Sequence, residues 1–323
     1  MSIKNDVLNL DSKFMEEDSK NEINKKIIEE NKFVHDKLGF YTNIYIPFLY
    51  QPIDIQNLDQ KKLFSKYFIF YSFNSQDMTK YLQKCLINAS KEIITFIIEE
   101  LKGNFRAVIK NKNGNCFCSD LIKICGQDNR IKILKELSNI LNEDSMDEFG
   151  TYPIQNLIEY ASTEYELKLL LTSFNEYEKI LMPALNPHGT FVIQKLIRHI
   201  PEKLRKDFNS IFVKFVSLLA RDTYGVFALE KFISYTKDEQ IHKQIYDSII
   251  NNFIDISTNK SGNYLIQNLL GKWWNNKKGE NLKKLIKSKF SLLSNNIYGV
   301  HICQLYNKLS KSNEESNLDS SLK

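Results

Sequence analysis

Residues 186–197 read Asn-Pro-His-Gly-Thr-Phe-Val-Ile-Gln-Lys-Leu-Ile. In this stretch Gly189 is followed by a small polar residue, an aromatic residue, two apolar residues and Gln194. The same order recurs, with weaker copies at the first and last positions, as Gly114-NCFCS, Gly150-TYPIQ, Gly225-VFALE, Gly262-NYLIQ and Gly299-VHICQ. Six of the eleven glycines therefore stand at one phase of a repeat of 36–39 residues, which indicates a repeat array.

Each interval between these glycines contains two apolar patterns at helical spacing. After Gly189, the first pattern ends at Pro201, and a second one follows over residues 204–220. The residues just before each glycine are turn and capping residues, such as Asn186 and Asp222. A helix pair of about 37 residues cannot bury its apolar stripe alone, so stacking of neighbours is expected. The sequence thus predicts an all-α solenoid.

The array has predicted limits on both sides. A step of 36 residues back from Gly114 reaches Met78, where Thr-Lys-Tyr-Leu-Gln keeps the frame without the glycine. We expect about seven repeats over residues 65–309. Residues 1–20 are expected to be disordered, residues 21–64 to form an N-terminal helix and capping segment, and residues 310–323 to form a flexible tail.

Part of each motif is not needed for the core. Val192, Ile193, Leu196 and Ile197 follow a helical stripe that is expected to be buried. The polar and aromatic positions lie on another face, and they recur in the four well-matched units as Thr151, Tyr152 and Gln155; Thr190, Phe191 and Gln194; Val226, Phe227 and Glu230; and Asn263, Tyr264 and Gln267. An aromatic side chain between two mostly polar ones is thus expected in unit after unit.

This repeated face suits single-stranded nucleic acid. An unpaired base needs a flat partner for its π-face and an amide or carboxylate for its Watson–Crick edge. The alternative is that the aromatic residues seal the core between repeats and that the glutamines are merely exposed helix formers. The recurrence of one face over four units favours the nucleic-acid interpretation.

The pattern resembles the PUF (Pumilio) family of RNA-binding repeat proteins over about residues 65–309. The resemblance implies a right-handed α-solenoid in the form of a crescent, with three-helix-like repeats. Their second helices would line a concave face that binds RNA, one base per repeat, with C-terminal repeats at the 5′ end. The family's reading positions are the first, second and fifth residues after the glycine.

On this resemblance, Asn263 and Gln267 with Tyr264 match the combination that reads uracil. Glu230 matches a carboxylate that accepts from guanine, although Val226 stands where the family usually has serine. The Thr/Gln pairs at Gly150 and Gly189 suit uracil or adenine. From the C-terminal side the four units would read 5′-U-G-U/A-A/U, which is compatible with the UGU core that the family typically prefers.

The outer units depart further from the family pattern. Asn115 and Ser119 flank Cys116, and Thr79 and Gln83 flank Lys80, so both units lack an aromatic residue at the second position. The bases at the 3′ end are therefore expected to be read less well. The Gly299 unit resembles a terminal half-repeat, and His301 is an additional candidate for stacking.

Composition excludes several other classes. The chain has no run near the roughly 18 apolar residues of a membrane span, and no P-loop, HExxH, GxSxG or GxGxxG motif. Cys116 and Cys118 form the only close cysteine pair and lack neighbouring histidine ligands, so no metal site and no cofactor are expected. We expect a monomer that is not an enzyme and is cytoplasmic, with a nucleolar location as the alternative.

The resemblance to the PUF family implies that the ligand is messenger RNA carrying a UGU element in its 3′ untranslated region, and that the role is post-transcriptional regulation. Regulatory proteins are expected on the convex face. Two alternatives remain: a divergent family member that binds structured RNA in ribosome assembly, and a protein-binding scaffold of the HEAT or armadillo kind. Eight lysines and one acid, Glu280, lie in residues 262–309, where they could attract a polyanion or form an ordinary solvated lysine face; the charge alone does not decide between the two.

Overall fold

A computed structural model describes residues 59–321, with side chains to residue 312. The predicted disorder of residues 1–20, and the helix and capping segment expected before residue 59, lie outside the described residues. From Gln60 onward the described chain is one compact unit built of helices, without a strand. None of the helices in this part is long and apolar enough to cross a membrane.

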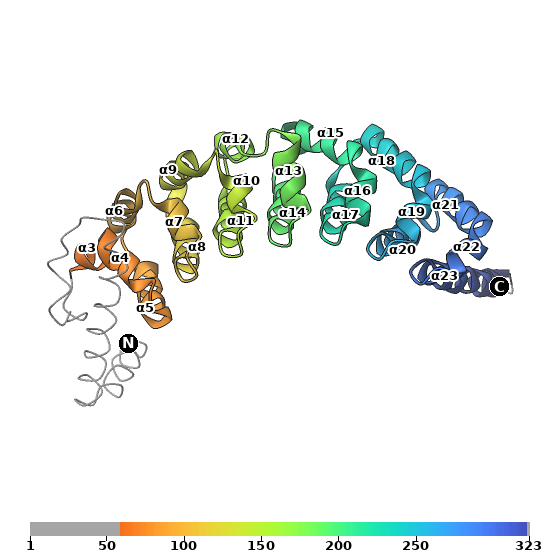
Figure 1. The fold of residues 1–323 in the computed structure, drawn as a ribbon, viewed down its shortest axis with the longest axis horizontal. Helices are drawn as coiled ribbons and strands as arrows, with labels where there is room; N and C mark the ends of the chain where they lie inside the picture. The colour runs from red at the N-terminus through yellow and green to blue at the C-terminus, as the bar shows by residue number, and fades with distance from the viewer. Residues whose placement is uncertain (1–58, 322–323) are drawn as a thin grey trace, which may run out of the picture. The chain divides into compact units, whose positions relative to one another are not determined.

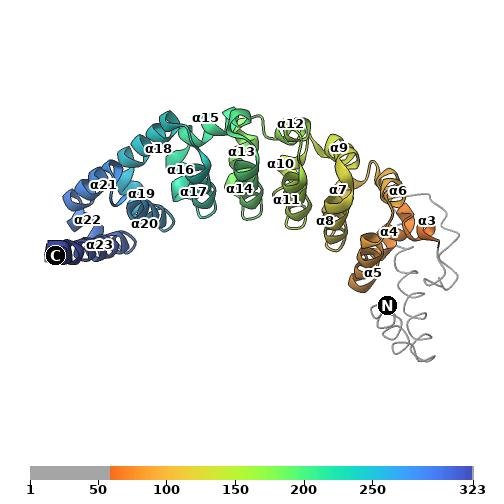
Figure 2. The ribbon, with the colours of Figure 1, turned by 180° about the vertical axis from the view of Figure 1, so that it is seen from behind.

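The helices that begin at or beside the repeat glycines, together with α5 of the unit that lacks the glycine, lie side by side in one row on the concave side of the unit (Figure 1). In the described part these inner helices are α5 (Gln76–Ile87), α8 (Gly114–Ile124), α11 (Thr151–Tyr160), α14 (Gly189–His199), α17 (Gly225–Tyr235), α20 (Gly262–Trp273) and α23 (Gly299–Ser321). The same curved row is seen from behind in Figure 2. Residues 60–321 therefore form an all-α solenoid in the form of a crescent, as predicted.

Each repeat contains three helices, whereas the apolar pattern predicted a helix pair. The outer helices are α6 (Lys91–Leu101), α9 (Gly126–Leu137), α12 (Glu164–Thr172), α15 (Lys206–Lys214), α18 (Glu239–Asn251) and α21 (Lys277–Ser288). The short middle helices are α4 (Lys66–Ser72), α7 (Phe105–Ile109), α10 (Leu141–Asp144), α13 (Tyr177–Ala184), α16 (Val216–Arg221), α19 (Phe253–Ser257) and α22 (Phe290–Ser294). The single turn α3 (Gln60–Leu63) precedes them, and a 3₁₀ turn, η2 (Glu202–Leu204), precedes α15.

The second predicted helix is divided because one residue leaves the helical conformation. Phe215, between α15 and α16, has φ −108° and ψ 21°, near the sparsely populated bridge region. Asn252 and Lys289 hold similar values at the same phase of the next two repeats. The apolar stripe continues across the junction, since Phe212 and Leu219 are both buried, and for this reason the sequence pattern showed one helix.

The repeat glycines are required by a close backbone approach. A Cβ atom at Gly262 would lie 2.3 Å from the carbonyl oxygen of Ile256, at the end of the preceding middle helix. A Cβ atom at Gly150 would lie 2.5 Å from the corresponding carbonyl oxygen of Asp144. Neither glycine has a positive φ, so the missing side chain, and not backbone freedom, explains the residue type.

A side chain three residues before each glycine caps the turn into the inner helix. Asn186 Oδ1 accepts hydrogen bonds from the backbone N–H groups of His188 (2.8 Å) and Gly189 (3.0 Å). The corresponding caps in the other units are Asn111, Asp147, Asp222, Asn259 and Asn296. In the unit without the glycine, Ser75 Oγ accepts from Met78 N at 3.4 Å, which supports the frame assigned there.

The core runs along the row between the helix layers. Val192, Ile193, Leu196 and Ile197 have no solvent exposure, which confirms the predicted buried stripe. Neighbouring repeats are also joined by polar contacts in this interior.

One of these contacts is a buried ion pair between the outer helices α9 and α12. Arg130 Nε donates to Glu166 Oε1 at 2.7 Å, and both side chains are almost completely buried. The other carboxylate oxygen accepts from Ser162 and Thr163 in a capping box at the start of α12. Burial favours the neutral carboxyl, but these hydrogen bonds outweigh it and lower the pKa of Glu166.

The last helix extends past the predicted end of the array. Helix α23 continues to Ser321, across most of the segment 310–323 that was expected to be a flexible tail. The segment contains no proline or glycine to end a helix that has already started, so each further residue adds one backbone hydrogen bond. The flexibility of this segment stays a prediction.

Candidate nucleic-acid interface

The aromatic residues two places after four of the repeat glycines project from the inner helices into solvent. The exposed fractions are 57% for Tyr152, 55% for Phe191, 52% for Phe227 and 63% for Tyr264. The two residues that follow each ring are buried and already close the core. These aromatic side chains therefore do not seal the space between repeats, and their faces are available for stacking.

The first-position side chains do not lie on the open surface. Thr79, Asn115, Thr151, Thr190, Val226 and Asn263 are all buried. Thr151 Oγ1 donates to the carbonyl oxygen of His188 (3.1 Å), and Thr190 Oγ1 donates to that of Tyr224 (3.2 Å), each in the next repeat. These threonines thus connect neighbouring inner helices, and their direct contact with a base stays a prediction.

The fifth-position glutamines are oriented by the first-position side chains. Gln155 Nε2 donates to Thr151 Oγ1 at 3.1 Å, and Gln194 Nε2 donates to Thr190 Oγ1 at 3.2 Å. Gln267 Nε2 donates in the same way to Asn263 Oδ1 at 2.9 Å. Asn263 is fixed in turn, because its amide donates to the carbonyl oxygens of Asn259 and Lys260.

Each of these glutamines therefore keeps one N–H and its carbonyl oxygen for a further partner. A donor beside an acceptor, held at a fixed angle, is what recognition of a base edge requires. The first-position side chain thus fixes the orientation of the fifth-position glutamine by a hydrogen bond, a relation that the sequence pattern alone did not show.

Glu230 is the acidic member of the fifth-position row. Its Oε1 accepts from Asn268 Nδ2 of the next repeat at 2.6 Å. Val226, at the first position of the same unit, is buried and offers no hydrogen bond to the carboxylate. The cross-repeat amide therefore orients Glu230, in place of the first-position side chain that orients the glutamines.

In the N-terminal unit, Gln83 is engaged across the repeat boundary. Its Nε2 donates to Asp120 Oδ2 of α8 at 2.6 Å. Thr79 donates to the carbonyl oxygens of Ser72 and Ser75, and Lys80 is exposed at the position of the ring. This unit presents a cation where its C-terminal counterparts present an aromatic face.

Two further predicted residues differ from the four well-matched units. Ser119 is buried at the fifth position of its unit, and Asn115 donates its amide to the carbonyl oxygens of Asn111 and Lys112. His301 is exposed on α23, and its Nδ1 lies 3.4 Å from Gln304 Oε1. His301 therefore holds the surface position expected of an additional stacking side chain.

A second polar row, at the sixth position after five of the six repeat glycines, was missed by the sequence analysis. It comprises Asp120, Asn156, Lys195, Lys231 and Asn268. Members of this row meet the fifth or ninth position of the preceding repeat, as in the Gln83–Asp120 and Glu230–Asn268 hydrogen bonds. The helical period contains the signal, since positions two, five, six and nine share one face.

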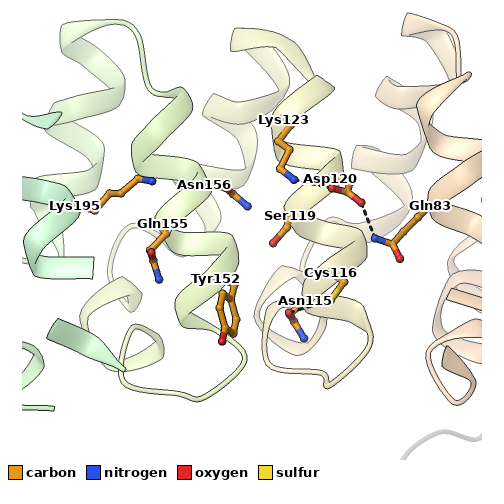
Figure 3. Close-up of a pocket in the computed structure, with 10 residues that line it drawn as sticks. All are labelled: Gln83, Asn115, Cys116, Ser119, Asp120, Lys123, Tyr152, Gln155, Asn156 and Lys195. Atoms are coloured by element: carbon orange, nitrogen blue, oxygen red, sulfur yellow. Dashed lines mark hydrogen bonds and ion pairs between the residues drawn. The ribbon is translucent and has the colours of Figure 1, made fainter. Parts of the chain in front are cut away.

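Part of this row lines a groove of about 420 Å³ on the inner face (Figure 3). It runs across α5, α8, α11 and α14, and its lining includes Ser119, Asp120, Lys123, Tyr152 and Asn156. In Figure 3 these side chains lie on the same face of adjacent helices. The groove thus combines one aromatic face with several polar groups.

Charges beside this groove are paired across and within helices. Glu159 of α11 forms ion pairs with Lys195 and Arg198 of α14, and the hydrogen bond from Lys195 lowers the pKa of the Glu159 carboxyl. The hydrogen bond from Lys123 to Asp120 raises the pKa of Lys123, which stays protonated at neutral pH. Lysine ammonium groups near the base-reading row suit contacts to phosphates.

Most of the lysines in the C-terminal segment do not lie on this face. Five of its lysines belong to the outer helix α21, on the convex side of the row (Figure 1). Lys283 is paired with Glu280, and its Nζ lies 4.6 Å from the centre of the Trp274 ring. These five lysines therefore lie away from the row of exposed rings, and attraction of a polyanion to this end stays a prediction.

Cys116 and Cys118 do not form part of a cluster of metal ligands. Cys116 is exposed on α8 and Cys118 is buried in the core. Within residues 59–312, no group of three or more histidine, cysteine, aspartate or glutamate side chains is placed to hold a metal ion.

The sequence matches the model of the Pumilio-family RNA binding repeat at residues 81–102, 145–171, 184–207 and 252–272. The last three stretches contain the motifs at Gly150, Gly189 and Gly262. Curated relatives include Pumilio homolog 12 of Arabidopsis thaliana, 23% identical over 202 residues, and Pumilio homolog 11 of the same plant, 25% identical over 226 residues. These alignments cover 62% and 69% of this chain but only 33% and 40% of the relatives.

Solved structures with the same fold include the RNA-binding domain of yeast Puf5p bound to AAT2 RNA. Its TM-score is 0.67 at 19% sequence identity, over 78% of this chain and 71% of that one. PUF-8 in complex with PBE-RNA gives a TM-score of 0.66 at 16% identity, over 92% of this chain and 87% of that one. The solenoid of inner, middle and outer helices is thus shared with both structures.

Proposed function

Because the chain belongs to the Pumilio family of RNA-binding repeat proteins, as a divergent member, we propose that it binds single-stranded RNA along its inner helices. The observation that carries the proposal is the row of four exposed aromatic rings at equivalent positions of α11, α14, α17 and α20. Stacking of a base on an aromatic side chain contributes about 1–3 kcal/mol per base. Repeat proteins of this kind bind one base per helical repeat.

The fifth-position side chains would supply the choice of base. Gln267, held by Asn263, offers one donor and one acceptor, which match the O4 or O2 and the N3–H of uracil. Glu230 offers carboxylate oxygens to the N1–H and N2–H groups of guanine. With the RNA antiparallel to the protein, as in the family, the site reads 5′-U-G at its beginning.

The next two units would be less selective. Thr151 and Thr190 each donate to a backbone carbonyl and accept from a glutamine, so both hydroxyl groups are occupied. Only the outer half of each glutamine amide then faces the base, and either uracil or adenine can bond to it. The proposed element is therefore 5′-U-G-U/A-A/U.

A UGU element of this kind in 3′ untranslated regions is the proposed target, with post-transcriptional regulation as the role. The chain spans about a third to two fifths of the length of the curated relatives named above. We further propose that the protein acts as a monomer in the cytoplasm and that regulatory proteins bind to its convex face.

Fluorescence anisotropy at physiological salt tests the proposal. The probe is a short labelled strand with 5′-UGUA, and the control is the same strand with 5′-ACAA at these positions. We expect the control to bind at least tenfold more weakly, which corresponds to about 1.4 kcal/mol. Equal binding of both strands would favour an RNA recognised by its structure, and no binding of either would favour a protein scaffold.

A further inference from the structure

The groove on the inner face passes over the Gly114 unit, which departs from the repeat pattern at two positions. In the Gly114 unit, Cys116 stands in place of the aromatic ring and Ser119 in place of the glutamine. Both replacements are smaller than the side chains of the neighbouring units, and both line the groove of about 420 Å³. The space that other repeats fill with a ring and an amide is therefore open here (Figure 3).

Ser119 contributes an unsatisfied polar group to this space. The residue is 8% exposed, and its Oγ has no hydrogen-bond partner within the described residues. A buried hydroxyl group without a partner destabilises the fold, so such groups in folded proteins usually have a water or ligand partner. Figure 3 shows Ser119 on the face of α8 that lines the groove.

The strongest hydrogen-bonding groups in the groove are Asp120 and Lys123. Lys123 Nζ donates to Asp120 Oδ1 at 2.9 Å, and Gln83 Nε2 holds the other carboxylate oxygen at 2.6 Å. Each carboxylate oxygen has a second lone pair, and the ammonium group has two further N–H donors. Together the pair presents one donor beside two acceptors, and Gln83 limits rotation of the carboxylate.

A donor followed by two acceptors is the complement of one base edge. The Watson–Crick edge of guanine presents the O6 acceptor, then the N1–H and N2–H donors. Uracil would place an acceptor, O2, against a carboxylate oxygen. Cytosine presents a donor followed by two acceptors, the same order as the Asp120–Lys123 pair, so each of its groups would face a group of the same kind. Adenine offers its N6–H donors but places the N1 acceptor beside them.

We propose that the Gly114 repeat selects guanine as the base 3′ to the U-G-U/A-A/U element, through Asp120 and Lys123 at the sixth and ninth positions after the glycine. The base lies in the groove over α8, with its Watson–Crick edge against the Asp120 carboxylate that Gln83 of α5 holds, and Cys116 leaves room for it. Ser119 completes the site with a hydroxyl group. This inference rests on the proposed function, because it extends the same RNA by one nucleotide.

Anisotropy measurements with full-length protein and five strands test the inference. Each strand carries 5′-UGUAN, where N is guanosine, adenosine, cytidine, uridine or inosine. We expect guanosine to bind at least tenfold more tightly than the other three standard nucleotides. Inosine, which lacks the 2-amino group, should bind more weakly than guanosine. This comparison requires no protein variant, so it is independent of any effect of mutation on folding.

Asp120→Asn should remove the preference for guanosine over inosine and over uridine, because an amide nitrogen takes the place of a carboxylate oxygen that accepts from guanine. Asp128→Asn is the matched control, since it removes the same charge from the exposed N-terminal turn of the outer helix α9. The control variant should keep the full preference. A retained guanosine preference in Asp120→Asn would overturn the assignment of this carboxylate.

Alkylation of Cys116 by iodoacetamide gives a separate readout, because this thiol is exposed in the free protein. A strand that ends after UGUA should leave Cys116 reactive, whereas UGUAG should slow its alkylation at least severalfold. Equal affinity for all five strands together with unprotected Cys116 would overturn the inference and leave the proposed function intact. Failure of every UGUA strand to bind would instead refute the proposed function.

Discussion

The change Tyr264→Ala separates a role in RNA binding from a role in folding. Tyr264 is 63% exposed on α20, so little apolar surface is lost from the core, and we expect a folding cost below about 1 kcal/mol. If the ring stacks on a base, its loss should cost about 1–3 kcal/mol of binding free energy. At about 1.4 kcal/mol per factor of ten, Kd should rise about 5- to 150-fold.

Fluorescence anisotropy with the 5′-UGUA strand measures this change, and urea denaturation of the same samples measures stability. Tyr264→Phe keeps the stacking face and should bind within about twofold of the unchanged protein. Leu218→Ala is a control for the loss of an exposed apolar side chain, since Leu218 lies on the middle helix α16. An unchanged Kd for Tyr264→Ala, or a stability loss above about 2 kcal/mol, would refute the reasoning.

Three further changes test other parts of the account. Gln267→Ala should cost about 1–3 kcal/mol and relax the choice of the first base, measured against four strands that differ only there; equal losses for all four would contradict the assignment. Lys283→Ala with Lys284→Ala should leave RNA affinity and its salt dependence within about twofold, because α21 is an outer helix, and a reduced salt slope would contradict this placement. Glu166→Gln should destabilise the fold by about 3–5 kcal/mol in thermal or urea denaturation, since it leaves Arg130 buried without a counter-charge. Because the folded-state pKa of Glu166 is lowered, the ion pair should stabilise the unchanged protein fully above the ordinary carboxyl pKa of about 4.5, and this stabilisation should be lost as the pH falls below that value. If the stability of Glu166→Gln fell with acid as steeply as that of the unchanged protein, this assignment would be contradicted.

The repeat frame was predictable because its causes are local. Gly262 avoids the Ile256 carbonyl oxygen, and Asn259 caps the turn that precedes it, so both residue types are required at fixed distances along the chain. The exposed ring of Tyr264 also followed from the helical period, once Leu265 and Ile266 were assigned to the core. Local chemistry thus specified the order, phase and facing of the inner helices.

The contacts between repeats were not predictable from one unit at a time. The hydrogen bond from Thr190 to the carbonyl oxygen of Tyr224 depends on how closely two inner helices pack. The pairing of Glu230 with Asn268 joins residues 38 positions apart. The division of the outer helix at Phe215 also left no signal, because the apolar stripe continues across it.

The most direct test of base recognition by the inner helices is the substitution Glu230→Gln. Glu230→Gln keeps the size of the side chain and replaces a carboxylate oxygen by an amide nitrogen, so guanine loses an acceptor for one of its two donors. Affinities of both proteins are measured by anisotropy for strands with 5′-UGUA and 5′-UUUA.

The account predicts that the unchanged protein prefers the strand with guanine at least tenfold. In Glu230→Gln the preference should vanish or reverse, while the affinity for the uracil strand is kept or improved. An unchanged preference for guanine, or an equal loss of affinity for both strands, would contradict the claim that the inner helices read RNA base by base.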